Sequence, residues 1–110
     1  MNEDPKGGIP ESVINGLKAQ HGALIELGDE TVTMLFRVAN AGEWRRFITE
    51  ISDEKTRGDA QFVLFTACVV FPELAERQKV LARYPGFVQK IIPGLTDFCG
   101  LEKATVKKVY

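Results

Sequence analysis

The spacing of hydrophobic and polar residues changes several times along this chain, and each spacing predicts either a helix or a strand. The first pattern is helical. Val13, Ile14 and Leu17 recur at the spacing of one helix face, and they follow Pro10, a residue suited to the first turn of a helix. Gly22 is placed to end this helix, since glycine is the preferred residue just beyond a helix C-terminus.

The next pattern alternates with a period of two. Two β-prone runs, residues 23–27 and 31–38, flank the sequence Gly-Asp-Glu, which is typical of a tight hairpin turn. In the second run Val32, Met34 and Phe36 alternate with more polar residues, so one face of the hairpin is apolar. A lone hairpin is marginal in water, and we therefore expect this one to pack against helices or against another copy of the chain.

The sequence NAGEWRRFITEI, residues 40–51, carries the clearest helix signal. Asn40 is a good N-cap, and Glu43 stands three residues later, as in a capping box. The apolar residues that follow fall on one helical stripe, and we expect all of them to lie in the core. They are Trp44, Phe47, Ile48 and Ile51.

Residues 62–71, FVLFTACVVF, form an uncharged run that allows two interpretations. Its β-branched residues favour a strand. Asp59 as N-cap and Pro72 as terminator bracket a length that is normal for a helix, so we favour a helix that is apolar nearly all round. On that interpretation Leu64 and Cys68 belong to the core. The run is far too short to span a bilayer, which needs about 20 apolar residues, and we expect no membrane contact.

Two more helical segments complete the pattern. Residues 72–84 carry an apolar stripe that includes Leu81, which we assign to the core. Residues 86–100 read as a last helix that is broken or kinked at Pro93. The sequence thus predicts an α+β fold, with an N-terminal helix and β-hairpin followed by a bundle of about four helices.

The domain organisation follows from length and composition. With 110 residues, 45% of them hydrophobic, the chain has the size of one globular domain. We assign residues 9–100 to a single α+β domain, residues 1–8 to a flexible N-terminus and residues 101–110 to a C-terminal tail. The N-terminus lacks the cationic start and apolar run of a signal peptide, so we expect a cytoplasmic protein.

Charge and candidate chemistry argue against several functions. A formal net charge of −1 is unlike that of a nucleic-acid-binding domain, which shows a basic face. His21 is the single histidine, and Cys68 and Cys99 form no CxxC motif, so a zinc site lacks its usual ligands. A disulfide between the two cysteines is an alternative, but buried free thiols are favoured. We expect no catalytic residue, no cofactor, no metal and no nucleic acid.

Three short motifs in a fixed order resemble the tail assembly chaperones of long-tailed bacteriophages. They are an "EWxRF" helix, a "CVVxP" segment and an "LxRYPG" turn before a last helix. The resemblance covers roughly residues 24–100, and it departs from the family at "VANAGE", where we expect a proline, and at Pro93. The matching residues are Glu43, Trp44, Arg46 and Phe47; Cys68, Val69, Val70 and Pro72; and Leu81, Arg83, Tyr84, Pro85 and Gly86.

The resemblance implies a function without catalysis. Such chaperones bind the helical tape-measure protein, shield its apolar surface and help to recruit tail tube subunits. The resemblance also implies a homo-oligomer in the host cytoplasm that is absent from the mature virion. The candidate partner-binding residues are Phe71, Tyr84 and Phe87; for the last two we expect a contact surface on the exposed side of the last two helices, since they are apolar residues beside a turn. Two alternatives stay open: a structural or completion subunit of the tail, and a small regulatory binding protein with a host target.

Overall fold

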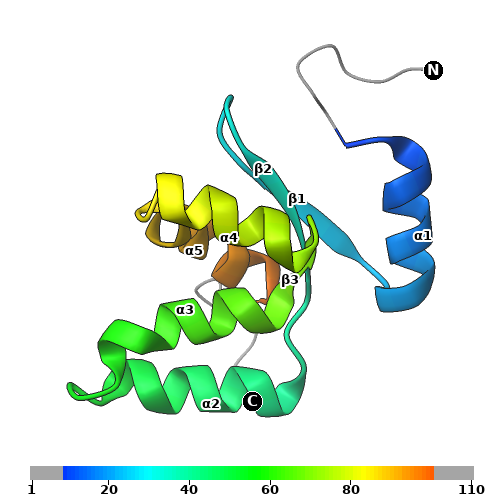
Figure 1. The fold of residues 1–110 in the computed structure, drawn as a ribbon. Coiled ribbons are helices and arrows are strands. Elements are labelled where there is room, and N and C mark those ends of the chain that lie inside the picture. Colours follow the sequence, from blue (N-terminus) through cyan, green and yellow to red (C-terminus); the bar gives the residue numbers. More distant parts are fainter. Residues whose placement is uncertain (1–8, 101–110) are drawn as a thin grey trace, which may run out of the picture.

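Residues 9–100, the part of the chain that the computed structural model describes, form an α+β fold of five helices and a three-stranded antiparallel sheet (Figure 1). The predicted fold class is confirmed. The predicted flexible N-terminus and C-terminal tail lie outside the described residues. The elements in chain order are α1 (Glu11–His21), β1 (Leu24–Gly28), β2 (Thr33–Arg37), α2 (Ala41–Ser52), α3 (Arg57–Cys68), β3 (Val69–Phe71), α4 (Leu74–Arg83) and α5 (Phe87–Phe98).

The sheet is built on the predicted hairpin, with β2 between β1 and β3. In the hairpin Ile25 pairs with Phe36 and Leu27 with Met34, so these four residues share one face of the sheet. Phe36 and Met34 are fully buried on that face, against which α5 packs. The hairpin thus gains the cover that two isolated strands would lack.

The apolar run 62–71 is divided between a helix and a strand. α3 ends at Cys68, and Val69–Phe71 continue as β3, which pairs antiparallel with β2. The predicted single helix is therefore wrong beyond Cys68. Edge pairing explains the change, because β2 would otherwise expose a row of unpaired backbone groups and β-branched valines suit a strand.

The start of α3 also differs from the prediction. The helix begins at Arg57, with Thr56 at the N-cap position, three residues before the N-cap expected at Asp59. The Thr56 hydroxyl makes no cap hydrogen bond and instead donates to the Glu50 carbonyl oxygen at 2.7 Å. The link between α2 and α3 is therefore tighter than its polar sequence indicates.

The predicted capping box of α2 is confirmed. The Asn40 side chain accepts a hydrogen bond from the Glu43 N–H at 2.8 Å, and the Glu43 carboxylate accepts one from the Asn40 N–H at 2.9 Å. The same carboxylate pairs with Arg37 at 2.7 Å, and Arg37 also donates to the Ala67 carbonyl oxygen at 2.7 Å. Hydrogen bonding from Arg37 holds the pKa of Glu43 below its ordinary value. Arg37 thereby connects β2, α2 and α3.

The core lies among the sheet, α2, α3 and α5. Of the seven residues predicted for it, Phe47, Leu64 and Cys68 are buried, and three more are partly buried and pack against it. Those three are Trp44, Ile51 and Leu81.

Ile48 is the correction among the predicted core residues, since it is 38% exposed. It follows the buried Phe47 by one residue, and successive helix residues point about 100° apart. The buried stripe of α2 is therefore narrower than its apolar pattern, and Ile48 lies at the edge of that stripe.

α5 runs without a break from Phe87 to Phe98, although Pro93 lies inside it. Proline lacks the N–H that would bond the carbonyl of Gln89, but burial of Ile92 and Leu95 on either side holds the helix against its neighbours. Gly94 allows a close approach to the sheet, since a Cβ there would lie 2.8 Å from a methyl carbon of Leu27.

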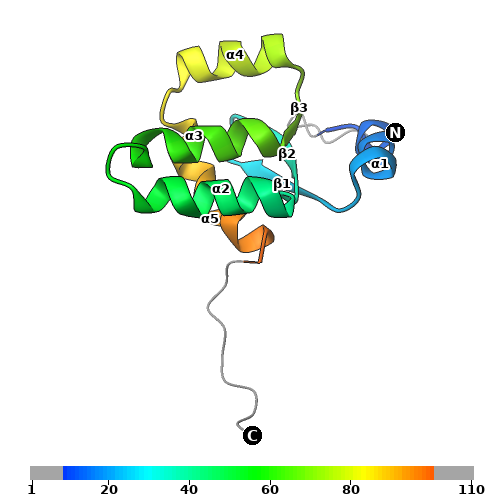
Figure 2. The same cartoon turned by 90° about the horizontal axis from the view of Figure 1, so that it is seen from below.

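Two helices contribute no fully buried residue, although Val80 and Leu81 of α4 pack against the core. Neither α1 nor α4 contains a buried residue. Figure 1 shows α1 beside the sheet and away from the other helices, and Figure 2 shows α4 as the outermost element above α3. Within residues 9–100, no helix is long and apolar enough to cross a membrane.

Candidate functional site

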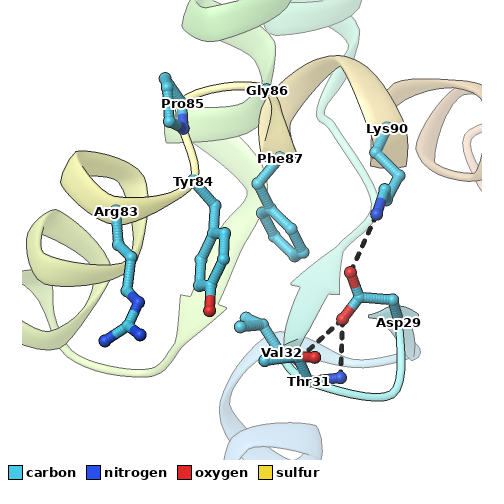
Figure 3. Close-up of a pocket in the computed structure, with 9 residues that line it drawn as sticks. All are labelled: Asp29, Thr31, Val32, Arg83, Tyr84, Pro85, Gly86, Phe87 and Lys90. Atoms are coloured by element: carbon cyan, nitrogen blue, oxygen red, sulfur yellow. Dashed lines mark hydrogen bonds and ion pairs between the residues drawn. The ribbon is translucent and has the colours of Figure 1, made fainter.

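A pocket of about 440 Å³ lies between the turn of the β1–β2 hairpin and the segment that joins α4 to α5 (Figure 3). The hairpin side is formed by Asp29, Thr31 and Val32, and the other side by residues 83–87 together with Lys90. We call it the aromatic pocket. Its volume falls within the range of roughly 300–1,000 Å³ that is usual for ligand sites.

Two aromatic rings form its apolar surface. Phe87 is buried, at 3% exposure, whereas Tyr84 is 39% exposed. In the view of Figure 3 both rings lie between Arg83 on one side and the ion pair of Lys90 with Asp29 on the other. The buried Phe87 ring is therefore fixed, whereas the exposed Tyr84 ring is accessible.

The backbone turn before α5 holds these rings in place. The Phe87 N–H donates to the Tyr84 carbonyl oxygen at 3.0 Å, which closes a four-residue turn. Pro85 occupies the second position of this turn, where its fixed φ is favourable. The sequence Tyr-Pro-Gly-Phe therefore determines the local geometry that brings an aromatic residue to each end of the turn.

The opposite side of the pocket depends on the hairpin turn. Gly28 has φ +155, and a Cβ there would lie 2.1 Å from the Val32 carbonyl oxygen, so only glycine fits. The Asp29 carboxylate then accepts hydrogen bonds from the N–H groups of Thr31 and Val32, both at 2.8 Å. This is the local turn that aspartate side chains favour.

An ion pair joins the two sides. Lys90 Nζ on α5 lies 2.9 Å from the Asp29 carboxylate, across 61 residues of sequence. The hydrogen bond from Lys90, followed by those from the Val32 and Thr31 N–H groups, lowers the pKa of Asp29 to about 2. Asp29 is therefore a fixed carboxylate at neutral pH.

This lowered pKa predicts a loss of stability in acid. The ordinary pKa of the carboxyl is 3.8 and its folded value is about 2, so its contribution is complete above about pH 5 and is lost as the pH falls through 2. We expect the urea midpoint of the native chain to exceed that of Asp29→Asn by a constant margin above pH 5. The margin should shrink to nothing as the pH falls through 2, and one that does not change with pH would contradict the assignment.

Arg83 carries the remaining charge of the pocket. Its guanidinium carbon lies 5.7 Å from the centre of the Tyr84 ring, a cation–π distance. Among residues 9–100, no carboxylate lies within 4.0 Å of it. Since Asp29 already pairs with Lys90, the aromatic pocket offers one cation without a carboxylate partner in the described part of the chain.

The cysteines lie elsewhere and are free thiols. Burial, as the largest cause, raises the pKa of Cys68 to about 12, so this thiol stays protonated and is a poor nucleophile. Cys99 Sγ accepts a hydrogen bond from the Ala39 N–H at 3.4 Å. The described residues contain no group of three or more His, Cys, Asp or Glu side chains placed to hold a metal ion.

The structure brings together two of the three predicted partner-binding residues. Tyr84 and Phe87 line the aromatic pocket, while Phe71 lies in β3, opposite Leu35 of β2. Phe87 is corrected from an exposed contact to a buried one, because the first turn of α5 points its ring into the core. Asp29 and Lys90 were missed as site residues, since no local pattern shows that they meet.

A second hollow of about 650 Å³ separates α1 from the outer face of the sheet. Ile14 and Lys18 of α1 line one side, and Leu24, Glu26 and Leu35 line the other. We call it the α1 groove. An 11-residue helix with no buried residue is marginal in water by itself, so this surface gains stability if it is covered.

Comparison with known proteins supports the fold and goes no further. No protein-family model and no curated protein matches the chain. Among solved structures, an uncharacterised protein from Bacillus stearothermophilus is similar, with a TM-score of 0.70 and 22% sequence identity. The match covers 86% of this chain and 99% of that one.

Proposed function

We propose that this chain is a non-catalytic chaperone of phage tail assembly, which binds the tape-measure protein and assists assembly of the tail tube. The observation that supports the proposal is the aromatic pocket, where an exposed tyrosine stands beside an arginine. Tyr and Arg are enriched among the residues that dominate protein interfaces. The "LxRYPG" motif that carries the resemblance also supplies one side of this pocket, through Arg83, Tyr84, Pro85 and Gly86.

The protonation states at hand favour binding over catalysis. A general acid or base works best with a pKa near the operating pH. In the pocket, the pKa of Asp29 is lowered to about 2 and its carboxylate is held by Lys90, so this group is poorly suited to proton transfer at neutral pH. The pocket therefore has the features of a recognition surface.

The expected homo-oligomer is part of the same proposal, and we assign its contact to the α1 groove. The groove combines apolar residues with one cation, Lys18, and one anion, Glu26. One charge of each sign on the same apolar surface lets it pair with a copy of itself, as a two-fold contact between identical chains requires. The occupant we propose is a second copy of this chain.

Co-expression with the tape-measure protein tests the proposal. We expect the long protein to be soluble only with this chain and to co-purify with several copies of it, counted from the mass of the eluate. Tyr84→Ala should reduce the yield of complex by roughly tenfold, the loss expected on truncating a central interface residue. Phe62→Ala, which removes a 51% exposed ring outside the pocket, should leave the yield unchanged.

Other outcomes point to the alternatives. A tape-measure protein that behaves the same with and without this chain contradicts the chaperone function. Detection of the chain in mature particles would then favour a structural or completion subunit of the tail. A partner found in host lysate would favour a small regulatory binding protein. In the function we propose, the chain acts in the host cytoplasm and leaves before the virion is complete.

A further inference from the structure

We infer that the aromatic pocket takes an apolar side chain that stands next to a carboxylate on a partner helix, and that Arg83 pairs with this carboxylate. The inference rests on the proposed function for the identity of the partner, but its chemistry follows from the pocket. The partner helix should therefore carry one apolar anchor residue with Asp or Glu three or four residues away.

The side chains that line the pocket carry an excess of positive charge. Three charged side chains line it, two cations and one anion. Lys90 and Asp29 neutralise each other at 2.9 Å, which leaves Arg83 beside the Tyr84 ring with no carboxylate among residues 9–100. A guanidinium forms bidentate pairs with a carboxylate, and this geometry makes the pair both stronger and more selective than a contact with a point charge.

The apolar part of the pocket decides what accompanies that carboxylate. The Tyr84 and Phe87 rings, Pro85 and Val32 present carbon surface around the cavity. A polar side chain placed there without a hydrogen-bond partner would lose several kcal/mol of hydration. An apolar side chain instead gains about 25 cal/mol for each Å² that it removes from water.

We assign the occupant to another protein and not to either segment that flanks residues 9–100, because the sequences of both segments suit the pocket poorly. The segment that follows the described residues, 101–110, contains one Glu and three Lys, so its charge has the same sign as that of Arg83. In the segment that precedes them, 1–8, Met1 has Asp4 three positions later, but the Pro5, Gly7 and Gly8 that follow disfavour the helix needed to present both on one face. An amphipathic helix of another protein satisfies both requirements, because residues three or four apart lie on the same helix face.

The test uses two blocked 15-residue helical peptides that differ in one position. Both carry a single Leu anchor, followed four residues later by Glu in one peptide and by Lys in the other. In an NMR titration of the full chain, the Glu peptide should shift the backbone amides of Thr31, Tyr84 and Lys90. We expect it to bind roughly tenfold more tightly than the Lys peptide, as a charge-assisted pair of hydrogen bonds implies.

Arg83→Glu should reverse this preference, while Arg45→Glu should preserve it. Both positions are exposed arginines, and Arg45 lies on α2, outside the pocket. Because neither side chain is buried, both variants should fold, and the NMR spectrum of each free variant should resemble that of the native chain. Equal binding of the two peptides, an unchanged preference in Arg83→Glu, or shifts outside the pocket would each overturn the inference.

The inference and the proposed function fail separately. If the peptides behave as expected but the tape-measure protein does not co-purify, the pocket chemistry stands and the proposed function fails. If the tape-measure protein co-purifies equally well with Arg83→Glu, the proposed function stands and the assignment of Arg83 fails.

Discussion

Replacement of Phe87 by alanine is expected to lower the free energy of unfolding by about 3–5 kcal/mol, the usual cost of truncating a buried phenylalanine. The ring is 3% exposed and belongs to the core cluster that includes Val88, Ile91 and Leu95. A domain of this size has a total stability of roughly 5–15 kcal/mol, so the variant should lose a large part of it. Urea denaturation followed by Trp44 fluorescence would measure the change.

Tyr84→Ala is the matched comparison for this prediction. Its ring is 39% exposed, so we expect a stability change below about 1 kcal/mol together with weaker partner binding. The pair of variants separates the structural role of the Phe87 ring from the recognition role that we propose for the Tyr84 ring. Equal losses of stability would contradict the division of the pocket into a fixed and an accessible ring.

Gly28→Ala is expected to disrupt the hairpin turn and to cost more than about 3 kcal/mol. The strained φ alone costs about 1–3 kcal/mol for a residue with a side chain. The added methyl group would also lie 2.1 Å from the Val32 carbonyl oxygen, which belongs to the backbone of the same turn. Either the turn opens or the Asp29 N–H loses its 2.8 Å hydrogen bond to that oxygen.

Gly58→Ala is the control for this effect. The position lies in α3, where an added Cβ meets nothing within 4 Å, and it has no positive φ. Alanine in a helix is more stable than glycine by up to about 1 kcal/mol, so this variant should gain stability. Chemical denaturation of both variants tests the pair, and a Gly28→Ala protein as stable as the native chain would contradict the turn geometry.

The elements that could be predicted are those whose signals are local. Asn40 and Glu43 stand three residues apart, and their capping box forms as the sequence indicates. Helix α1 begins after Pro10 and ends before Gly22, and the hairpin turn lies where Gly-Asp-Glu predicts it. In each case the determining contact joins residues only a few positions apart.

The predictions that failed depend on distant contacts. The run 62–71 turns from helix to strand because β2, more than thirty residues earlier, offers an edge for Val69–Phe71. Ile48 is exposed because the neighbours of α2 cover only part of its apolar stripe. The sequence predicted only the side of the aromatic pocket that is formed by Tyr84 and its turn. It did not predict that Asp29 meets Lys90, because this contact depends on the whole fold.

Asp29 and Lys90 are far apart in the sequence, and this separation also determines at what stage of folding the aromatic pocket forms. Asp29 is synthesised early and Lys90 late, so the hairpin side of the pocket is synthesised long before α5 can supply the other side. Contacts between residues so far apart require closure of a long loop, and they form late in folding. If the pocket binds the partner as we propose, a chain that ends before α5 lacks Phe87 and Lys90 and should not compete with the folded protein for that partner.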